Sequence, residues 1–216
     1  MELTALIAGF NEVATASVAD AVDKLAGKRG YMDESIKPRI NEKRICGPAV
    51  TVLEGATDEF VPPQHALELI DSAAAGSVMV IGIDGEANVA VWGGLMTAGA
   101  YARELAGAIL DGGVRDVTEI RRDYGFPVYA RSVSPGTTLG RFKTLGANVP
   151  VVCGGIEVHP GDLIVADIDG VVVVPRALAA EVLAMSQEID RRELEQAKLI
   201  VRARSLKEGL AKYGRI

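Results

Sequence analysis

The stretch Ala108-Ile109-Leu110-Asp111-Gly112-Gly113-Val114-Arg115-Asp116, near the middle of the chain, decides the predicted fold. The small apolar residues Ala106 to Leu110 are typical of a buried strand. Gly112 and Gly113 can adopt turn conformations closed to other residues, and Asp116 with Glu119 has capping-box spacing at the start of a helix. The stretch therefore predicts a strand, a glycine turn, the Arg115-Asp116 pair and a helix. Because ligands bind at the carboxyl ends of strands in layered α/β domains, this pair marks a candidate site. The alternative is that Asp116 only caps the helix and Arg115 only pairs with a surface carboxylate.

The sequence on either side alternates between strand and helix patterns. Strands are predicted over 45–53, 77–83, 127–130 and 149–153, with a hairpin of strands 163–166 and 171–174. Helices are predicted over 3–25 with a break at 15–17 (Ser17 opening the second part), and over 64–74, 95–106, 117–124, 175–203 and 206–213, with a loop at 134–146. The order predicts one α/β domain over residues 1–216. Residues 176–216 form a charged, amphipathic helical C-terminal arm, which is expected to contact a neighbouring subunit; a plain surface helix is the alternative.

Composition and charge limit the classes of protein to consider. The 216 residues are 49% hydrophobic and include 24 glycines, which favours a compact, turn-rich fold. The net charge of −6 gives no reason to expect a nucleic-acid partner. Residues 1–19 lack a basic segment and no apolar run is long enough to span a bilayer, so we expect a cytoplasmic protein without membrane contact. Cys46 and Cys153 are expected to be buried thiols rather than a disulfide.

Several common motifs are absent. The chain has no phosphate-binding loop, no G-x-G-x-x-G after a strand, no C-x-x-C and no H-E-x-x-H, so neither a nucleotide cofactor nor a zinc site is supported. His65 and His159 are interpreted as structural. Carboxylates at strand ends and turns could bind a hard cation, although most are expected to be ordinary turn formers; these are Asp84, Asp111, Asp116, Asp162, Asp167 and Asp169.

Gly93-Gly94-Leu95-Met96 is the second informative stretch. Two glycines ahead of a helix leave backbone N–H groups accessible, and the helix N-terminus adds a partial positive charge, an arrangement that binds carboxylate or phosphate. The alternative is a tight turn without a ligand. Together with Arg115, and with Asp116 able to hold Mg²⁺ along with waters, this stretch predicts a site for a small oxo acid.

In several motifs the chain resembles the RraA-like family. The resemblance lies in Trp92–Met96, Asp111–Asp116, Cys153-Gly154-Gly155, Pro160-Gly161-Asp162, Ala166–Pro175 and Ser17–Ala21, and it covers roughly residues 15–213. This family includes the 4-hydroxy-4-methyl-2-oxoglutarate aldolases, also called 4-carboxy-4-hydroxy-2-oxoadipate aldolases, and the regulators of ribonuclease E activity. The resemblance implies a swivelling β/β/α fold, assembled as a homotrimer or homohexamer with sites between subunits. An older family label, demethylmenaquinone methyltransferase, has no cofactor-binding motif here to support it.

For the site, the resemblance implies a lyase that uses Mg²⁺ or Mn²⁺ to release pyruvate from a 4-hydroxy-2-oxo acid and to decarboxylate oxaloacetate. Asp116 resembles the metal ligand of these aldolases and Arg115 the substrate-binding arginine, and the two are the candidate catalytic residues. Gly93, Gly94, Leu95 and Met96 resemble the loop whose amides hold the pyruvyl carboxylate. Gly94 departs from the pattern, because many of the aldolases carry an acidic residue there.

Two questions stay open at the level of sequence. The general base is not identified; Glu188 or Glu193 from a neighbour's arm is one option, and exposed helix charges with no such role are the other. The alternatives to the aldolase are a non-catalytic regulator of the ribonuclease E type and a related lyase acting on another 2-oxo acid. The regulators resemble this chain but look shorter, which favours the aldolase.

Overall fold

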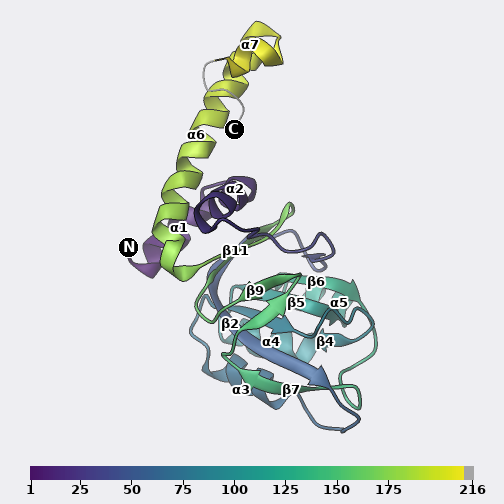
Figure 1. Cartoon of the computed structure of the whole chain (residues 1–216). Helices are drawn as coiled ribbons and strands as arrows, with labels where there is room; N and C mark the ends of the chain where they lie inside the picture. The colour runs from purple at the N-terminus through teal and green to yellow at the C-terminus, as the bar shows by residue number, and fades with distance from the viewer. Residues whose placement is uncertain (212–216) are drawn as a thin grey trace.

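A computed structural model describes residues 1–211, and a nine-stranded mixed sheet organises it (Figure 1). Four parallel strands form its centre: β2 (Ile45–Ala56), β3 (Val78–Gly82), β5 (Gly107–Val114) and β6 (Val128–Val133). The other members are β1 (Lys37–Pro38), β4 (Ala90–Trp92), β7 (Phe142–Ala147), β10 (Leu163–Asp167) and β11 (Gly170–Val174). β3 and β5 are buried along their whole length, which explains their continuous apolar sequence.

The sheet is nearly closed into a barrel. Its strand order is β1-β6-β5-β3-β2-β10-β11, so β1 and β11 are the two edges. The segment before β1 spans the gap between them: Tyr31 forms a bridge with Val172 on β11, and Met32 N donates to Val171 O at 2.8 Å. A separate hairpin of β8 (Val151–Cys153) and β9 (Ile156–Val158) packs into the interior core with residues of β3, β5 and β6.

Helices cover the sheet in two groups. α3 (Gln64–Ser72), α4 (Gly94–Ala102) and α5 (Val117–Asp123) share one apolar core with β3 and β5. α1 (Leu3–Asn11), α2 (Thr15–Ala26) and the start of α6 (Ala179–Ala203) pack on the β10-β11 hairpin. The mixed α/β architecture predicted from the sequence is confirmed.

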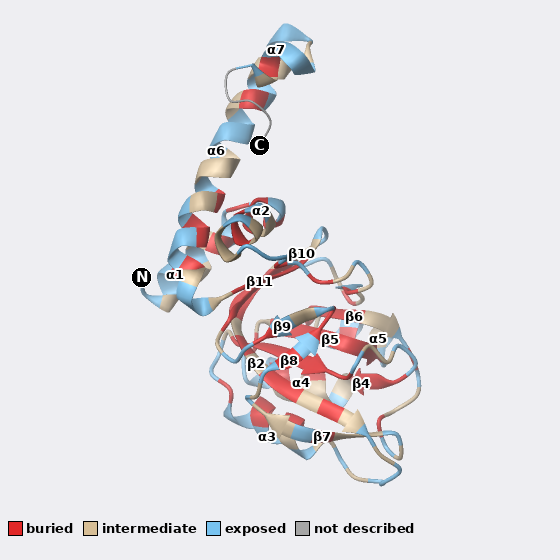
Figure 2. Cartoon of the chain, viewed as in Figure 1, coloured by how far each residue is buried: buried red, intermediate tan, exposed pale blue. Residues whose placement is uncertain are grey.

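The C-terminal helix extends beyond the body of the protein (Figure 1). A 3-10 turn, Arg176–Leu178, follows Pro175 and leads into α6, so the predicted start is confirmed to within a few residues. Figure 2 shows that burial on α6 is concentrated where it meets α2, and Leu194 and Val201 further along are 59% and 77% exposed. The final predicted helix is present as α7 (Leu206–Leu210); its last two predicted residues, 212 and 213, lie outside the described residues.

The predicted turn at Gly112-Gly113 is wrong, because both glycines lie within β5. They are required for close approach rather than for a turn. A Cβ on Gly112 would lie 3.2 Å from Val89 O, and one on Gly113 would lie 3.0 Å from the same oxygen and 2.9 Å from Ser132 Oγ. The 83–89 loop therefore packs directly on the backbone of β5. The strand continues to Val114, four residues past its predicted end at Leu110, and Arg115 and Asp116 follow it directly.

Other predicted boundaries also need correction. The helix predicted to reach Ala106 ends at Ala102, because Glu104 has a left-handed φ of 56° and the next residues lead into β5. The loop predicted at 134–146 contains most of β7, which pairs with β2. The helix break falls before Thr15, and Ser17 does not open a helix: its hydroxyl donates to Asp190 Oδ1 on α6.

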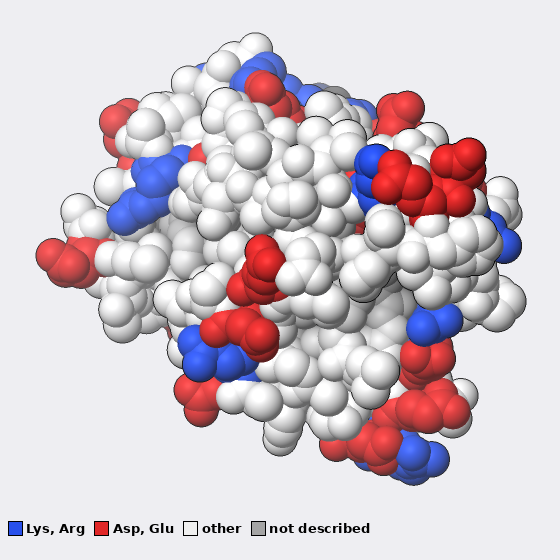
Figure 3. Space-filling view, turned by 90° about the horizontal axis from the view of Figure 1, so that it is seen from below, with Lys and Arg blue, Asp and Glu red and all other residues white. Residues whose placement is uncertain are grey.

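The charged side chains are dispersed on the face shown in Figure 3. Acidic and basic groups stand there in small clusters separated by uncharged side chains, and the described chain offers no continuous basic track on this face. Among residues 1–211, no helix combines the length and the apolar character that crossing a membrane requires.

Candidate active site

Residues predicted for the site meet in one cleft of about 250 Å³. Arg115 and Asp116 reach it from the end of β5, and Gly93 to Met96 reach it from the start of α4. The remaining wall is formed by β4 (Ala90–Trp92), Pro62, Pro63, Leu67 and residues 137–139. Residues 137–139 were missed by the sequence reasoning; they are placed by the bridge between Thr137 and Ala90 on β4, a long-range pairing without a local signal.

Asp116 does not cap α5 with its side chain, so the capping prediction is wrong. The residue has left-handed backbone angles, φ 57° and ψ 33°, which turn its side chain away from the helix that follows. Its Oδ2 instead accepts a hydrogen bond of 2.8 Å from Gly94 N, at the start of α4. Within the described chain Oδ1 accepts no hydrogen bond, and the side chain is 43% exposed. Asp116 therefore presents one free oxygen at the cleft, held in a backbone conformation that is costly for a non-glycine residue.

Gly93 is required by the position of the Arg115-Asp116 pair. A Cβ at Gly93 would lie 2.8 Å from Asp116 Oδ2 and 3.1 Å from Arg115 Nε. At Gly94 the nearest contact would be 3.4 Å, an ordinary van der Waals distance, so a side chain could fit there. A side chain at position 93 would therefore displace the Asp116 carboxylate and the Arg115 side chain from their present positions. With glycine at position 94, Asp116 is the only acidic residue among the described residues that line the cleft.

The amino end of α4 offers further hydrogen-bond donors. The first bond within the helix runs from Thr97 N to Gly93 O at 3.0 Å, so the amides of Leu95 and Met96 precede the helical ladder. The helix is fixed on β4 because Trp92 Nε1 donates to Thr97 Oγ1 at 2.8 Å and the indole stacks on Phe126. These donors, with the helix dipole, can bind a carboxylate beside the Arg115 guanidinium.

The residues of the cleft fit a divalent ion of the magnesium type. Among the described residues no group of three or more His, Cys, Asp or Glu side chains could enclose a metal, so a cage made of protein ligands is absent there. Mg²⁺ is usually held by one or two carboxylates with waters and substrate oxygens completing its shell. The free Oδ1 of Asp116 at an open cleft suits that mode.

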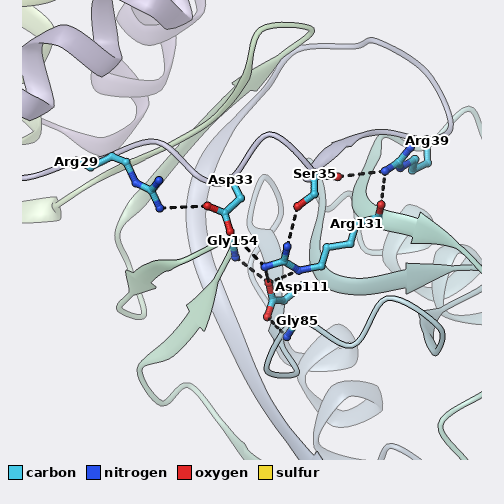
Figure 4. Close-up of polar contacts among 8 residues, drawn as sticks. All are labelled: Arg29, Asp33, Ser35, Arg39, Gly85, Asp111, Arg131 and Gly154. Carbon is cyan, nitrogen blue, oxygen red and sulfur yellow. Dashed lines mark hydrogen bonds and ion pairs between the residues drawn. The ribbon is translucent and has the colours of Figure 1, made fainter.

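Asp111 is buried in an ion pair (Figure 4). It is 2% exposed, and its Oδ1 accepts from Arg131 Nη2 at 2.7 Å and from Gly154 N at 2.8 Å. Its Oδ2 accepts from Gly85 N at 2.7 Å. Arg131 in turn donates to Ser35 Oγ. Asp111 on β5 is thereby linked to the turn at Gly85, to Arg131 on β6 and to the turn at Gly154. Because both of its oxygens already accept hydrogen bonds, Asp111 is not a cation ligand.

The other aspartates considered as possible cation ligands also have structural roles, as expected for most of them. Asp167 pairs with Arg44 at 2.7 Å, and Asp162 is buried and accepts hydrogen bonds from two backbone N–H groups. Asp84 has a left-handed φ of 55° in the turn after β3, and Asp169 lies in the two-residue loop of the β10-β11 hairpin.

The histidines and cysteines lie outside the cleft. His65 Nδ1 is 2.8 Å from Thr144 Oγ1 at the start of α3, and His159 lies in the turn after β9. Both cysteines are buried and free. Burial raises the pKa of the Cys46 thiol to about 11 and also raises that of Cys153, so neither is a ready thiolate.

Of the two glutamates considered as a base from the arm, Glu188 is poorly suited. It pairs with Arg191 at 2.8 Å and Arg192 at 2.6 Å, and hydrogen bonds from these arginines lower its pKa to about 2. A carboxylate with so low a pKa is a weak proton acceptor. Glu193 lies on the exposed side of α6.

Glu54 is an acidic residue that the sequence reasoning missed, because it follows directly after the predicted end of a strand. It lies on β2 at a bulge, opposite Thr144 on β7, and is 3% exposed. Neither carboxyl oxygen has a hydrogen-bond partner in the described chain, and burial raises the pKa of Glu54 to about 7. Glu54 does not line the cleft.

A larger hollow lies elsewhere, in a groove of about 990 Å³ between α2 and α6. Its wall includes Leu25, Met185 and Ile189, and its acidic and basic groups belong to the two helices that form it. The chemistry favours the smaller cleft, because the free carboxylate, the guanidinium and the helix N-terminus meet there and not in the groove.

Comparisons with known proteins agree with this architecture. The profile of the family described as "RraA-like: Aldolase/RraA" matches residues 15–173. A protein of Halalkalibacterium halodurans named "Putative 4-hydroxy-4-methyl-2-oxoglutarate aldolase" is 33% identical over 196 residues, which is 88% of this chain and 87% of that protein.

Two solved structures extend the match to three dimensions. An uncharacterised protein from Pseudomonas syringae pv. tomato has a TM-score of 0.86 and 29% identity, covering 99% of this chain and 98% of that one. Streptomyces coelicolor RraAS2, described as an unusual member of the RNase ES inhibitor RraA protein family, has a TM-score of 0.80 and 27% identity, covering 88% and 94%. The predicted fold class is confirmed, and the chain belongs to the RraA-like (Aldolase/RraA) family.

Proposed function

We propose that this chain is a divalent-metal-dependent lyase that releases pyruvate from 4-hydroxy-4-methyl-2-oxoglutarate or 4-carboxy-4-hydroxy-2-oxoadipate, and that decarboxylates oxaloacetate. The observation that carries the proposal is the convergence of Asp116, Arg115 and the amino end of α4 on one cleft. The name of the Halalkalibacterium relative supports the same activity.

In this proposal the start of α4 binds the carboxylate shared by all three substrates. The amides of Leu95 and Met96 donate to it, and the helix dipole favours its negative charge. Gly93 contributes by leaving room for the Arg115-Asp116 pair. Gly94 contributes its amide to Asp116 and so fixes the direction of that carboxylate.

Arg115 stabilises the charge that develops during the reaction. Cleavage of the bond between C3 and C4 leaves its electron pair on the pyruvyl fragment, where it spreads onto the keto oxygen, while the C4 hydroxyl loses its proton. A guanidinium beside that oxygen lowers the barrier because it is already oriented before the charge forms. Loss of CO₂ from oxaloacetate leaves the same charge and needs the same group.

Asp116 would hold Mg²⁺ or Mn²⁺, which when bound supplies Lewis-acid polarisation of the keto group. The proton acceptor for the C4 hydroxyl is a water or a carboxylate from a neighbouring subunit. Glu193 is the better of the two arm glutamates for that role, because Glu188 is held by two arginines.

We also propose that the arm, residues 176–216, makes contacts between subunits of a homotrimer or homohexamer. Leu194, Val201 and Leu206 are 59%, 77% and 64% exposed on the projecting part of the chain. Apolar side chains spaced along an extended helix are stabilised when a second chain covers them. Light scattering coupled to gel filtration measures the mass of the assembly, and a monomer would contradict the proposal.

The second candidate function is a non-catalytic regulator. The match to RraAS2 favours it, because a member of an RNase inhibitor family covers 88% of this chain. Chain length therefore does not separate the two classes. Stoichiometric binding to a ribonuclease E, without any lyase activity, would support the regulator.

Pyruvate release, measured with a coupled lactate dehydrogenase assay, tests the proposal. Oxaloacetate and 4-hydroxy-4-methyl-2-oxoglutarate are each supplied with Mg²⁺ or with EDTA. Metal-dependent release from both supports the aldolase, whereas release from oxaloacetate alone would indicate a related lyase with another natural substrate. No release from either substrate by the folded protein would contradict the proposal.

A further inference from the structure

A second cleft, of about 400 Å³, lies between the carboxyl end of α2, the β9 strand and the 3-10 turn before α6. It shares no lining residue with the cleft at Asp116. Its volume is within the range of about 300–1,000 Å³ that is typical of small-molecule sites. Nothing in the proposed lyase mechanism uses it.

Positive side chains dominate the opening of this second cleft. Lys28, Arg29 and Arg176 all line it, in a chain whose net charge is −6. Among the described residues, Lys28 and Arg176 form no ion pair. Arg29 pairs with Asp33 at 3.2 Å, where both side chains are substantially exposed and the interaction is correspondingly weak. Three cations are therefore available to an incoming anion.

The acidic residues of the cleft are already engaged. Asp162 is buried, and its Oδ2 accepts from His159 N at 2.9 Å while its Oδ1 accepts from Arg176 N at 3.0 Å. These bonds fix both the turn after β9 and the backbone that carries the Arg176 side chain. Glu157 lies 3.5 Å from His159 Nε2, so its charge faces the imidazole. With three cationic and two acidic side chains in its lining, the cleft carries a formal charge of +1.

The remaining wall is apolar. Val22 and Ala26 on α2, Ile156 on β9, Val173 on β11 and Pro175 face the same space. A fully solvated inorganic ion gains little from such a surface, whereas a ligand with an apolar body would bury it. The cleft thus combines cations at its opening with an apolar floor.

Two glycines help to shape this space. A Cβ at Gly155 would lie 2.8 Å from Arg29 Nη2, so the guanidinium lies directly against this turn (Arg29 is drawn in Figure 4). A Cβ at Gly30 would lie 2.3 Å from Val22 Cγ1, which shows how closely the loop after α2 packs on the floor. Arg29 also lies over the Tyr31 ring, 5.6 Å from its centroid. The cleft is therefore largely preformed.

We propose that this cleft binds a small organic anion, a carboxylate or phosphate ester with an apolar body, and that Lys28 and Arg176 are its main charge contacts. The site is separate from the proposed lyase site, and its occupancy does not depend on that function. Carboxylate and phosphate share the chemistry required, so the choice between them is left to the probes below.

The two histidines give the experiment its internal control, because His159 lines the cleft and His65 is held at the start of α3. The full-length protein, labelled with ¹³C at histidine Cε1, is titrated with phenylphosphate, benzoate and inorganic phosphate, and calorimetry gives each Kd. We expect the His159 signal to shift with saturation while the His65 signal stays fixed. Phenylphosphate or benzoate should bind at least five times more tightly than inorganic phosphate, and the tighter of the two identifies the head group.

Variants then test the named contacts. Lys28→Gln with Arg176→Gln should weaken binding at least tenfold, whereas Lys24→Gln, which removes one positive charge outside the cleft, should leave Kd unchanged. Binding should also survive Arg115→Gln, which alters only the other cleft. The proposal is overturned if none of the probes binds saturably, if inorganic phosphate binds as tightly as the organic anions, or if Lys24→Gln or Arg115→Gln weakens binding as much as the double change.

Discussion

Replacing Glu54 with Gln should remove a pH-dependent loss of stability. In the folded chain the pKa of Glu54 is raised by burial from its ordinary 4.5 to about 7, and neither oxygen has a partner among the described residues. The folded state therefore binds a proton between pH 4.5 and 7 that the unfolded state has released. Stability from this group is fully present below pH 4.5, and is lost as the pH rises through 7.

The size of the effect follows from the interval between the two pKa values. At about 1.4 kcal/mol per pH unit, the interval from 4.5 to about 7 corresponds to about 3 kcal/mol of unfolding free energy. The Gln variant keeps the shape of the side chain and cannot ionise. Any change that burying the amide makes to the unfolding free energy of the variant is the same at every pH. The unfolding free energy of the variant minus that of the parent should therefore rise by about 3 kcal/mol between pH 4.5 and 8.

Urea unfolding at fixed protein concentration, at half-unit pH steps from 5 to 8, measures this difference. Glu2→Gln is the matched control, because it makes the same chemical change at an exposed position outside the core. A flat difference for Glu54→Gln across the same range would refute the reasoning and would mean that the Glu54 carboxyl is solvated or paired in the folded protein.

Three further predictions follow from the contacts described above. Gly93→Ala should reduce pyruvate release more than tenfold while Gly94→Ala has little effect, because only the first new Cβ would lie within 3 Å of Asp116 Oδ2; equal losses in the two variants would contradict this. Asp111→Asn should destabilise the fold by about 3 kcal/mol in urea unfolding, because Arg131 loses its buried charge partner and keeps only the more distant, more exposed Asp33 at 3.6 Å; a change below about 1 kcal/mol would count against it. Cys46 and Cys153 should react with a disulfide reagent at pH 8 only after unfolding, and rapid labelling of the folded protein would show that the thiols are accessible.

Local sequence patterns were sufficient for most of the fold. The apolar runs of β3 and β5 and the hairpin around Asp167–Gly170 are signalled by neighbouring residues, and the structure places them as predicted. β7 could not be predicted in this way, because its pairing with β2 joins residues about ninety positions apart. The Gly112-Gly113 pair misled the prediction since close packing and a turn both require glycine, and only the position of Val89 distinguishes them.

The candidate site was predicted in part. Arg115, Asp116 and Gly93 to Met96 were singled out from the sequence, and the structure brings them to one cleft. The orientation of Asp116 was not predictable, because capping-box spacing favours a cap while the actual left-handed φ directs the carboxylate to Gly94. Glu54 and the second cleft depend on tertiary packing alone, and no local pattern indicates either of them.

The central claim is that Asp116 and Arg115 perform metal-dependent release of pyruvate. The most direct measurement is the rate of that release from oxaloacetate and from 4-hydroxy-4-methyl-2-oxoglutarate in the Asp116→Asn variant, compared at saturating Mg²⁺ with the parent and with Asp123→Asn. Asp123 is the last residue of α5, the short helix that follows Asp116; it lies outside the cleft and pairs with Arg122. We expect Asp116→Asn to lose at least a hundredfold in rate while Asp123→Asn keeps the parent rate. Full activity in a folded Asp116→Asn protein would contradict it.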